Sequence, residues 1–173
     1  MLMPRRTGFT IIEVMVVVVV IAILATIALV GYGSVRTQAD DTKRASDIAT
    51  FREAMQLWST INKTAPHLSG TGYGGGTGWT WSDAYPLSIE TLLINSKLIA
   101  EPMRDPLANT NSQYMFYRCN TTTYGNTYAF FAKLSDPAEQ SGNQLSRWLS
   151  LGCTTTPSSS YGMNYALMFE QNL

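Results

Sequence analysis

The sequence predicts an α+β fold, in which a long N-terminal α-helix packs on a small antiparallel β-sheet. Three observations predict it: an apolar run over residues 14–30 with Thr26 as its one polar side chain, an apolar stripe of helical period over residues 48–58, and a C-terminal half with three runs of strand composition. Twelve basic and twelve acidic side chains balance each other. Because no basic excess would release counterions from a phosphate backbone, the sequence contains no strong nucleic-acid signal.

Residues 9–30 have the length and composition of a membrane-spanning helix. At about 1.5 Å per residue these 22 positions extend over roughly 33 Å, which is enough for the hydrocarbon core of a bilayer. Arg5 and Arg6 precede the run, and Asp40 and Asp41 follow it. This charge asymmetry predicts that the N-terminus lies inside the cell and the bulk of the chain outside.

A secretory signal peptide is the alternative interpretation of this segment. Its apolar stretch is usually shorter and ends at a small-x-small cleavage site, which residues 25–28 (Ala-Thr-Ile-Ala) fit poorly. Cleavage there would also leave Glu13 without a role.

Glu13 is the one ionisable residue within residues 9–30. A carboxylate in an apolar helix costs several kcal/mol unless it is paired or reaches the interface. One interpretation places Glu13 at the membrane edge, where it stays hydrated. The other starts from its spacing: a chain cut after Gly8 would carry a new α-amine on Phe9, one helical turn before Glu13. That amine could neutralise the carboxylate of a neighbouring subunit.

Residues 5–13 (Arg-Arg-Thr-Gly-Phe-Thr-Ile-Ile-Glu), with the apolar run behind them, resemble the prepilin signature of type IV pilins and type II secretion pseudopilins. The resemblance implies cleavage between Gly8 and Phe9 by a membrane prepilin peptidase. It also implies N-methylation of Phe9, and Glu13 as the acid that forms an assembly salt bridge with a neighbour's amine. Many relatives carry a proline near the end of the apolar run. Here Gly31 and Gly33 occupy that region, so any bend would have to come from the glycines.

Four segments follow from this interpretation. They are a leader peptide over residues 1–8, a hydrophobic membrane and filament-core helix over 9–30, an amphipathic helix continuation over 31–62, and a globular head over 63–173 with the antiparallel sheet. Pro66 is expected to end the long helix.

The amphipathic continuation carries an apolar stripe and two charged pairs. The stripe, which is expected to pack on the sheet, comprises Ile48, Phe51, Met55 and Trp58, and the apolar surface is extended by Ala54, Leu57 and Ile61. Asp40 with Arg44, and Lys43 with Asp47, are spaced i,i+4 and are expected to pair on exposed turns. Contacts between subunits are the alternative use of this charged face.

The head begins with a Gly-rich segment, residues 69–82, which predicts a flexible surface loop that displays Tyr73, Trp79 and Trp81. Gly70, Gly72 and Gly75 formally match a dinucleotide-binding motif, but that motif needs a preceding strand. Further along, Ser88 is expected to cap a short helix over 89–94. Residues 113–119 and 127–134 predict a β-hairpin, residues 163–169 a third strand, and residues 144–149 a short helix.

Cys119 and Cys153 both lie in the part expected outside the membrane, where a disulfide can form. A bridge would fasten the C-terminal segment to the sheet, much as pilins often staple that region. Two unpaired thiols are the alternative.

The sequence predicts no catalytic site, cofactor or metal site, and we do not expect an enzyme. His67 is the single histidine. Asp136, Glu139 and Asn143 could form a calcium site, although a solvated polar loop fits them better. Two triplets, at Asn62 and Asn120, match the N-glycosylation acceptor, and residues 154–160 are rich in Ser and Thr.

The resemblance implies the structural subunit of a type IV pilus-like filament for adhesion, twitching motility or DNA uptake. The precursor would wait in the inner (cytoplasmic) membrane with its head outside, and then join a helical homopolymer on the cell surface. The implied partners are the prepilin peptidase and the pilus assembly platform with its ATPase. Residues 98–106 also resemble the major pseudopilin of type II secretion. A membrane-anchored extracellular binding module, with an uncleaved N-terminus, is the other alternative.

Overall fold

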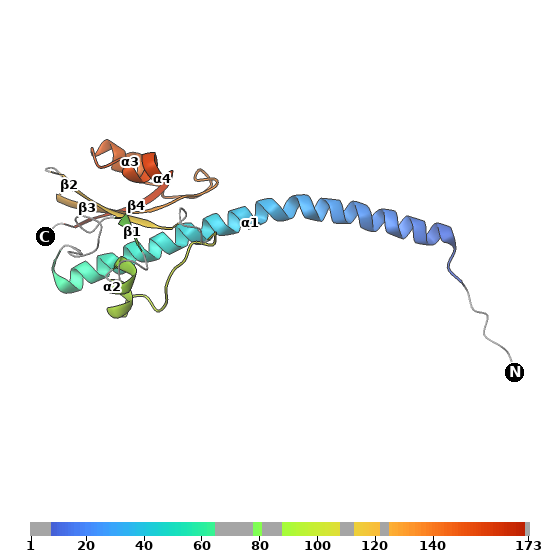
Figure 1. Cartoon of the computed structure of the whole chain (residues 1–173), viewed down its shortest axis with the longest axis horizontal. Coiled ribbons are helices and arrows are strands. Elements are labelled where there is room, and N and C mark those ends of the chain that lie inside the picture. Colours follow the sequence, from blue (N-terminus) through green and yellow to red (C-terminus); the bar gives the residue numbers. More distant parts are fainter. Residues whose placement is uncertain (1–7, 65–77, 81–87, 108–112, 122–124, 172–173) are drawn as a thin grey trace. The chain divides into compact units, whose positions relative to one another are not determined.

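The computed structural model describes residues 8–64, 78–80, 88–107, 113–121 and 125–171, and it confirms the α+β class (Figure 1). The elements in chain order are α1 (Ile11–Asn62), β1 (Gly78–Trp79), α2 (Ile89–Asn95), β2 (Met115–Thr121), β3 (Gly125–Ala132), α3 (Leu145–Ser150), α4 (Thr156–Tyr161) and β4 (Tyr165–Gln171). The chain divides into two compact units, residues 1–38 and 39–173. The end of α1 at Asn62 agrees with the predicted helix end, and the helix runs through Gly31 and Gly33 without interruption.

The second unit contains a four-stranded antiparallel sheet with the order β1-β2-β3-β4. The predicted hairpin and third strand are confirmed. Both hairpin strands extend two residues further toward their turn than expected, because Asn120 pairs with Asn126 and Thr121 with Gly125. The flexible loop predicted over residues 69–82 is wrong at Gly78 and Trp79, which form β1 against β2.

The first core of this unit lies between the sheet and α1. Side chains alternate between the faces of a strand, so Phe116, Phe130 and Phe169 point toward α1, where Phe51 stacks on Phe130 with ring centroids 5.5 Å apart. The predicted stripe is confirmed, since Ile48, Phe51 and Met55 are fully buried and Trp58 packs partly buried against them.

The buried face of α1 is narrower than the apolar pattern suggested. Ala54 is buried, but Leu57 is 50% exposed and Ile61 is 63% exposed. At about 100° per residue, these two positions lie roughly 80–120° around the helix from Phe51. Leu57 and Ile61 therefore point away from the sheet.

A buried ion cluster joins α1 to two distant loops of the same unit. Arg44 donates to Asp105 through Nε (2.9 Å) and Nη2 (3.1 Å), and to Asp41 through Nη1 (2.8 Å). Asp41 in turn accepts hydrogen bonds from the backbone amides of Ser135 and Asp136. Burial lowers the pKa of Arg44, but the hydrogen bonds and charges of Asp105 and Asp41 outweigh burial and raise it overall.

The two ion pairs that the sequence predicted on α1 have different outcomes. The pairing of Asp40 with Arg44 is wrong, because Arg44 is 2% exposed and turns inward to Asp41 and Asp105. The pairing of Lys43 with Asp47 is confirmed at 2.6 Å. Asp47 also accepts a hydrogen bond from the Tyr114 hydroxyl (2.6 Å); burial and this bond raise the pKa of Tyr114.

The short helix α2 lies on the same face of the sheet as α1, because its Ile89 and Leu93 belong to the first core. The predicted cap is confirmed, since the Ser88 hydroxyl accepts a hydrogen bond from the Thr91 amide. Glu90 is buried and accepts hydrogen bonds from the Met103 amide and the Arg104 guanidinium. These bonds hold residues 103–104 against α2, next to Asp105.

The second core lies on the opposite face of the sheet, which α3 and α4 cover (Figure 1). Met115, Phe131 and Met168 point to this face, and Trp148 of α3 is fully buried with its edge toward Phe131. The predicted helix over 144–149 is confirmed as α3. Most of the Ser- and Thr-rich stretch over residues 154–160 lies in α4 (Thr156–Tyr161).

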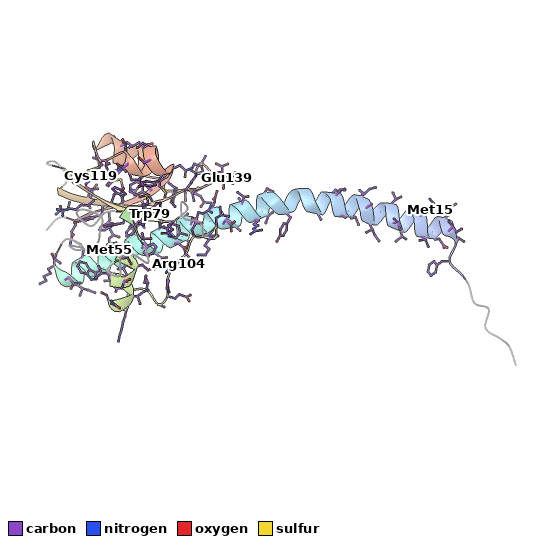
Figure 2. The ribbon with its side chains drawn as sticks, in the orientation of Figure 1. Met15, Met55, Trp79, Arg104, Cys119 and Glu139 are labelled. Carbon is purple, nitrogen blue, oxygen red and sulfur yellow. A yellow bond between two sulfur atoms is a disulfide. The ribbon has the colours of Figure 1, made fainter. Side chains whose placement is uncertain are left out.

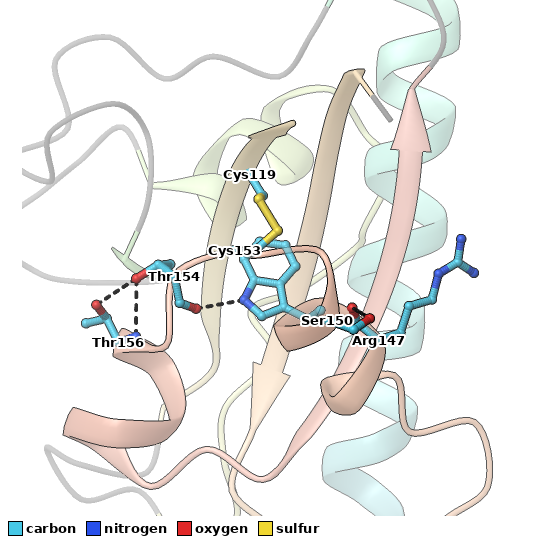
Figure 3. The surroundings of a disulfide bond; sticks show 7 residues. Cys119, Arg147, Ser150, Cys153, Thr154 and Thr156 are labelled. Atoms are coloured by element: carbon cyan, nitrogen blue, oxygen red, sulfur yellow. Dashed lines mark hydrogen bonds between the residues drawn. A yellow bond between two sulfur atoms is a disulfide. The ribbon is translucent and has the colours of Figure 1, made fainter. Parts of the chain in front are cut away.

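Cys119 of β2 is bonded to Cys153, which follows α3 (Figure 3). Beside the bridge, Trp148 donates from its indole nitrogen to the carbonyl of Thr154 (2.8 Å). The disulfide and this hydrogen bond together hold the segment between α3 and α4 against the sheet.

The substitution Arg44→Ala is expected to lower the free energy of unfolding of the second unit by about 3–5 kcal/mol, because it leaves two carboxylates buried without their cation. Urea unfolding of the full chain in detergent, followed by Trp fluorescence, measures this change. Lys43→Ala is the matched control, because Lys43 is 50% exposed and its pair is expected to contribute less than about 1 kcal/mol. Equal effects of the two substitutions would contradict the role given to Arg44.

Replacing both cysteines, Cys119→Ala with Cys153→Ala, is expected to lower the free energy of unfolding by about 3–4 kcal/mol, the chain-entropy estimate for a loop of this length. Urea unfolding in detergent tests the size of the effect. Peptide maps with and without reductant test the bond itself, and recovery of both thiols free from native protein would contradict it.

Candidate functional site

The segment around the predicted cleavage point lies just outside the long helix. Gly8, Phe9 and Thr10 are not helical, and α1 begins at Ile11. Phe9 is 88% exposed. The peptide bond between Gly8 and Phe9 is therefore free of helical hydrogen bonds and accessible to an enzyme. The expected leader residues Arg5 and Arg6 lie outside the described residues.

Thr10 and Glu13 cap the start of α1 by reciprocal hydrogen bonds. The carboxylate of Glu13 accepts from the Thr10 amide (2.8 Å) and from the Thr10 hydroxyl (2.7 Å). The Thr10 hydroxyl accepts in return from the Glu13 amide (3.3 Å). This is a capping box, which satisfies two backbone donors that the first turn would otherwise leave unpaired.

The capping box gives Glu13 a role within its own chain that the sequence analysis missed. The signal was present in the sequence, because Thr-x-x-Glu before an apolar run is the pattern of this motif. A negative charge in the first turn is also favoured by the helix dipole. Glu13 is therefore held at the helix start, one turn from Phe9, before any neighbouring subunit is considered.

The part of α1 that directly follows Glu13, residues 14–30, is apolar on all sides apart from Thr26. Its most apolar window has a mean hydropathy of 3.2 and none of it is buried, so α1 is long and apolar enough to cross a membrane. Figure 2 shows Met15 near the start of this helix. The one polar side chain of the run, Thr26, donates its hydroxyl to the carbonyl of Ile23 (2.7 Å), which satisfies it within the helix. Such a surface needs lipid or other protein to cover it.

The candidate calcium ligands have other partners. Asn143 uses its side-chain oxygen to accept from the amides of Leu145 and Ala166, and Asp136 accepts from the Ala138 amide. Within the described ranges, no group of three or more His, Cys, Asp or Glu side chains could hold a metal ion.

Other residues singled out in the sequence have mixed outcomes. Asn62 is exposed and donates from its side chain to the Trp58 carbonyl. Trp79, expected on display in a loop, packs edge-on against Tyr161 and is half-buried. His67, the three glycines of the formal dinucleotide motif, Tyr73 and Trp81 lie outside the described residues.

Comparison with known protein families identifies the N-terminal segment. Residues 3–29 match the family model described as the prokaryotic N-terminal methylation motif. No curated protein and no solved structure matches the chain. The matched stretch contains the exposed Gly8–Phe9 bond, the Thr10–Glu13 capping box and most of the apolar run. The chain therefore carries, at its N-terminus, the class III prepilin signal of type IV pilins and pseudopilins.

Proposed function

We propose that this chain is the structural subunit of a type IV pilus-like filament, and that it acts as a building block and not as an enzyme. The observation that carries the proposal is the matched N-terminal motif, together with its geometry. Within the matched residues, the Gly8–Phe9 bond lies outside the helix, Glu13 stands in the first turn, and an exposed apolar helix follows; these features support the proposal. A separate head of α+β architecture follows in the same chain.

Processing comes first in the proposed sequence of events. Prepilin peptidase cuts between Gly8 and Phe9 and methylates the new amine of Phe9. The non-helical backbone at Gly8, Phe9 and Thr10 supports this step, since a protease needs an extended segment that it can bind. The capping box supports it further, because it starts the helix at Ile11 and keeps the helix from extending over the cleavage point.

Assembly follows from the properties of the helix surface. In the inner membrane, lipid covers the apolar side chains of the first unit, and the head lies outside. In the filament, the same side chains pack against neighbouring subunits, so leaving the lipid exposes no apolar surface to water. The amine of Phe9 and the carboxylate of Glu13 on adjacent subunits then neutralise each other in an apolar environment, where an unpaired charge is costly. The assembly platform and its ATPase supply the work.

The filament class is a long surface pilus for adhesion, twitching motility or DNA uptake. The pseudopilus of a type II secretion system is the second candidate, and residues 98–106 favour it by their resemblance to the major pseudopilin. In the structure this stretch supplies Met103, Arg104 and Asp105, which bind Glu90 and Arg44. Deleting the gene separates the two candidates: loss of surface filaments supports the pilus, and loss of protein secretion with surface filaments intact supports the pseudopilus.

Intact mass and N-terminal sequencing of the protein from its native cell test the processing step. We expect a chain that begins at Phe9, lacks Met1–Gly8 and carries one added methyl group. The substitution Gly8→Val is expected to leave the precursor uncut, because a branched side chain replaces the hydrogen at the cleavage point. A native chain that still begins at Met1 supports the anchored binding module, and one cut near Ala28 supports a signal peptide; either outcome overturns the proposal.

Three substitutions separate the two roles of Glu13. Glu13→Gln keeps an oxygen for the Thr10 amide and hence the capping box, but it removes the charge. We expect filament yield to fall about 100-fold or more, because an amine left unpaired in an apolar bundle costs about 3 kcal/mol or more. Glu13→Ala should lose both roles, while the monomer stays in the membrane.

Thr10→Val is the matched control, since it removes the cap and keeps the charge of Glu13. We expect it to destabilise the helix start by about 0.5–2 kcal/mol and to allow filaments to form. Electron microscopy and quantification of sheared filaments measure all three variants. Wild-type filament yield from Glu13→Gln would show that the charge is not required for assembly.

A further inference from the structure

Strand β4 lies at an edge of the sheet, and four outward-facing backbone groups over residues 164–168 are paired by two side chains and one backbone amide. The Asn143 side chain donates to the Asn164 carbonyl (2.8 Å) and accepts from the Ala166 amide (3.1 Å). The backbone amide of Gln144 donates to the Ala166 carbonyl (2.8 Å), and its side-chain oxygen accepts from the Met168 amide (2.6 Å). Four successive outward groups of the strand edge are thus satisfied.

These bonds have the pattern of a neighbouring strand. The side-chain amide of Asn143 presents an N–H donor and a carbonyl acceptor to β4, as a peptide group of a neighbouring strand would. Gln144 supplies the next donor from its backbone and the next acceptor from its side chain. Beyond them, Arg147 forms an ion pair with Glu170 (2.6 Å). This pair places a long charged side chain next to the C-terminal end of β4.

The segment before α3 is shaped for this position. Gly142 has φ +82°, a left-handed conformation that residues with a side chain rarely adopt. The Tyr165 hydroxyl donates to the Ser141 carbonyl (2.7 Å), which ties the same turn back to β4. The turn therefore brings Asn143 and Gln144 alongside the strand.

We propose that Asn143 and Gln144 form a built-in cover that closes the β4 edge to strand addition by a second copy of this chain. An uncovered edge is a template for pairing with another strand, and natural proteins block such edges. The most direct partner is the same strand of another copy, because two antiparallel β4 strands related by a two-fold axis match their donors to their acceptors. Residues 165–169 of β4 are buried, so an exposed edge would present an ordered, apolar strand.

The proposal does not depend on the filament function, since it concerns contacts within the head. Its test uses the full chain in detergent micelles and the double substitution Asn143→Ala with Gln144→Ala. We expect the amides of Ala166 and Met168 to exchange with deuterium roughly tenfold faster or more at low protein concentration, because each has lost its acceptor. At higher concentration we expect a dimer by light scattering, with protection of both amides restored.

Gln140→Ala is the matched control, because the hydrogen bond that the structure shows for the Gln140 side chain goes to the Thr42 hydroxyl (3.4 Å) and not to β4. It is expected to keep the mass and the exchange rates of the unaltered chain. Gln144→Glu is expected to behave in the same way, since it keeps an acceptor for the Met168 amide. If the double variant fails to fold, Gln144→Ala alone exposes the Met168 amide and is measured in its place.

Three results would overturn the proposal. In the first, the Ala166 and Met168 amides of the double variant exchange fast, but its molar mass by light scattering equals that of the Gln140→Ala control at every concentration. An open edge would then attract no second copy. The second is association in which both amides still exchange fast, because the contact would then lie elsewhere on the chain. The third is unchanged exchange in the double variant, which would show that Asn143 and Gln144 are not the cover.

Discussion

The exposed apolar surface of the first half of α1 is the constraint on which the rest of the structure depends. Within residues 14–27 the exposed large apolar side chains are roughly half exposed, and the most apolar stretch of α1 has no buried position. Among the described residues, neither hydrophobic core includes a side chain of this stretch, whereas the first core includes Ile48, Phe51 and Met55. One helix thus has two halves with different requirements: the second packs within its own chain, and the first needs lipid or other subunits.

A charge at the start of such a helix requires local compensation. The capping box supplies it, because Thr10 gives Glu13 two hydrogen bonds before any partner subunit is present. The same bonds cap the helix at its start, so one pair of residues satisfies a carboxylate and leaves Phe9 outside the helix. The placement of the charge and the accessibility of the Gly8–Phe9 bond are therefore consequences of a single local motif.

Much of the fold could be predicted from local patterns, and the parts that could not depend on partners far apart in the chain. The helical stripe, the hairpin, the third strand and the cap at Ser88 each have a short-range signal. Arg44 does not, since its main partner, Asp105, is 61 residues away, and spacing along one helix suggested Asp40 instead. β1 has two residues and exists because β2 pairs with it. The capping box of Thr10 and Glu13 could have been predicted, because its Thr-x-x-Glu pattern lies within four residues of the sequence.

The described part of the head uses its apolar surface internally. α1 and α2 cover one face of the sheet, α3 and α4 cover the other with the help of the Cys119–Cys153 bridge, and Asn143 and Gln144 pair the β4 edge. Among the described residues, most of the exposed large apolar side chains lie within residues 9–35, and only a few, such as Leu57, Ile61 and Leu107, lie in the second unit. The distribution of burial among the described residues therefore favours the N-terminal helix as the surface of association that the proposed function requires. In the proposed filament, each second unit would keep its own cores while the apolar helices pack together.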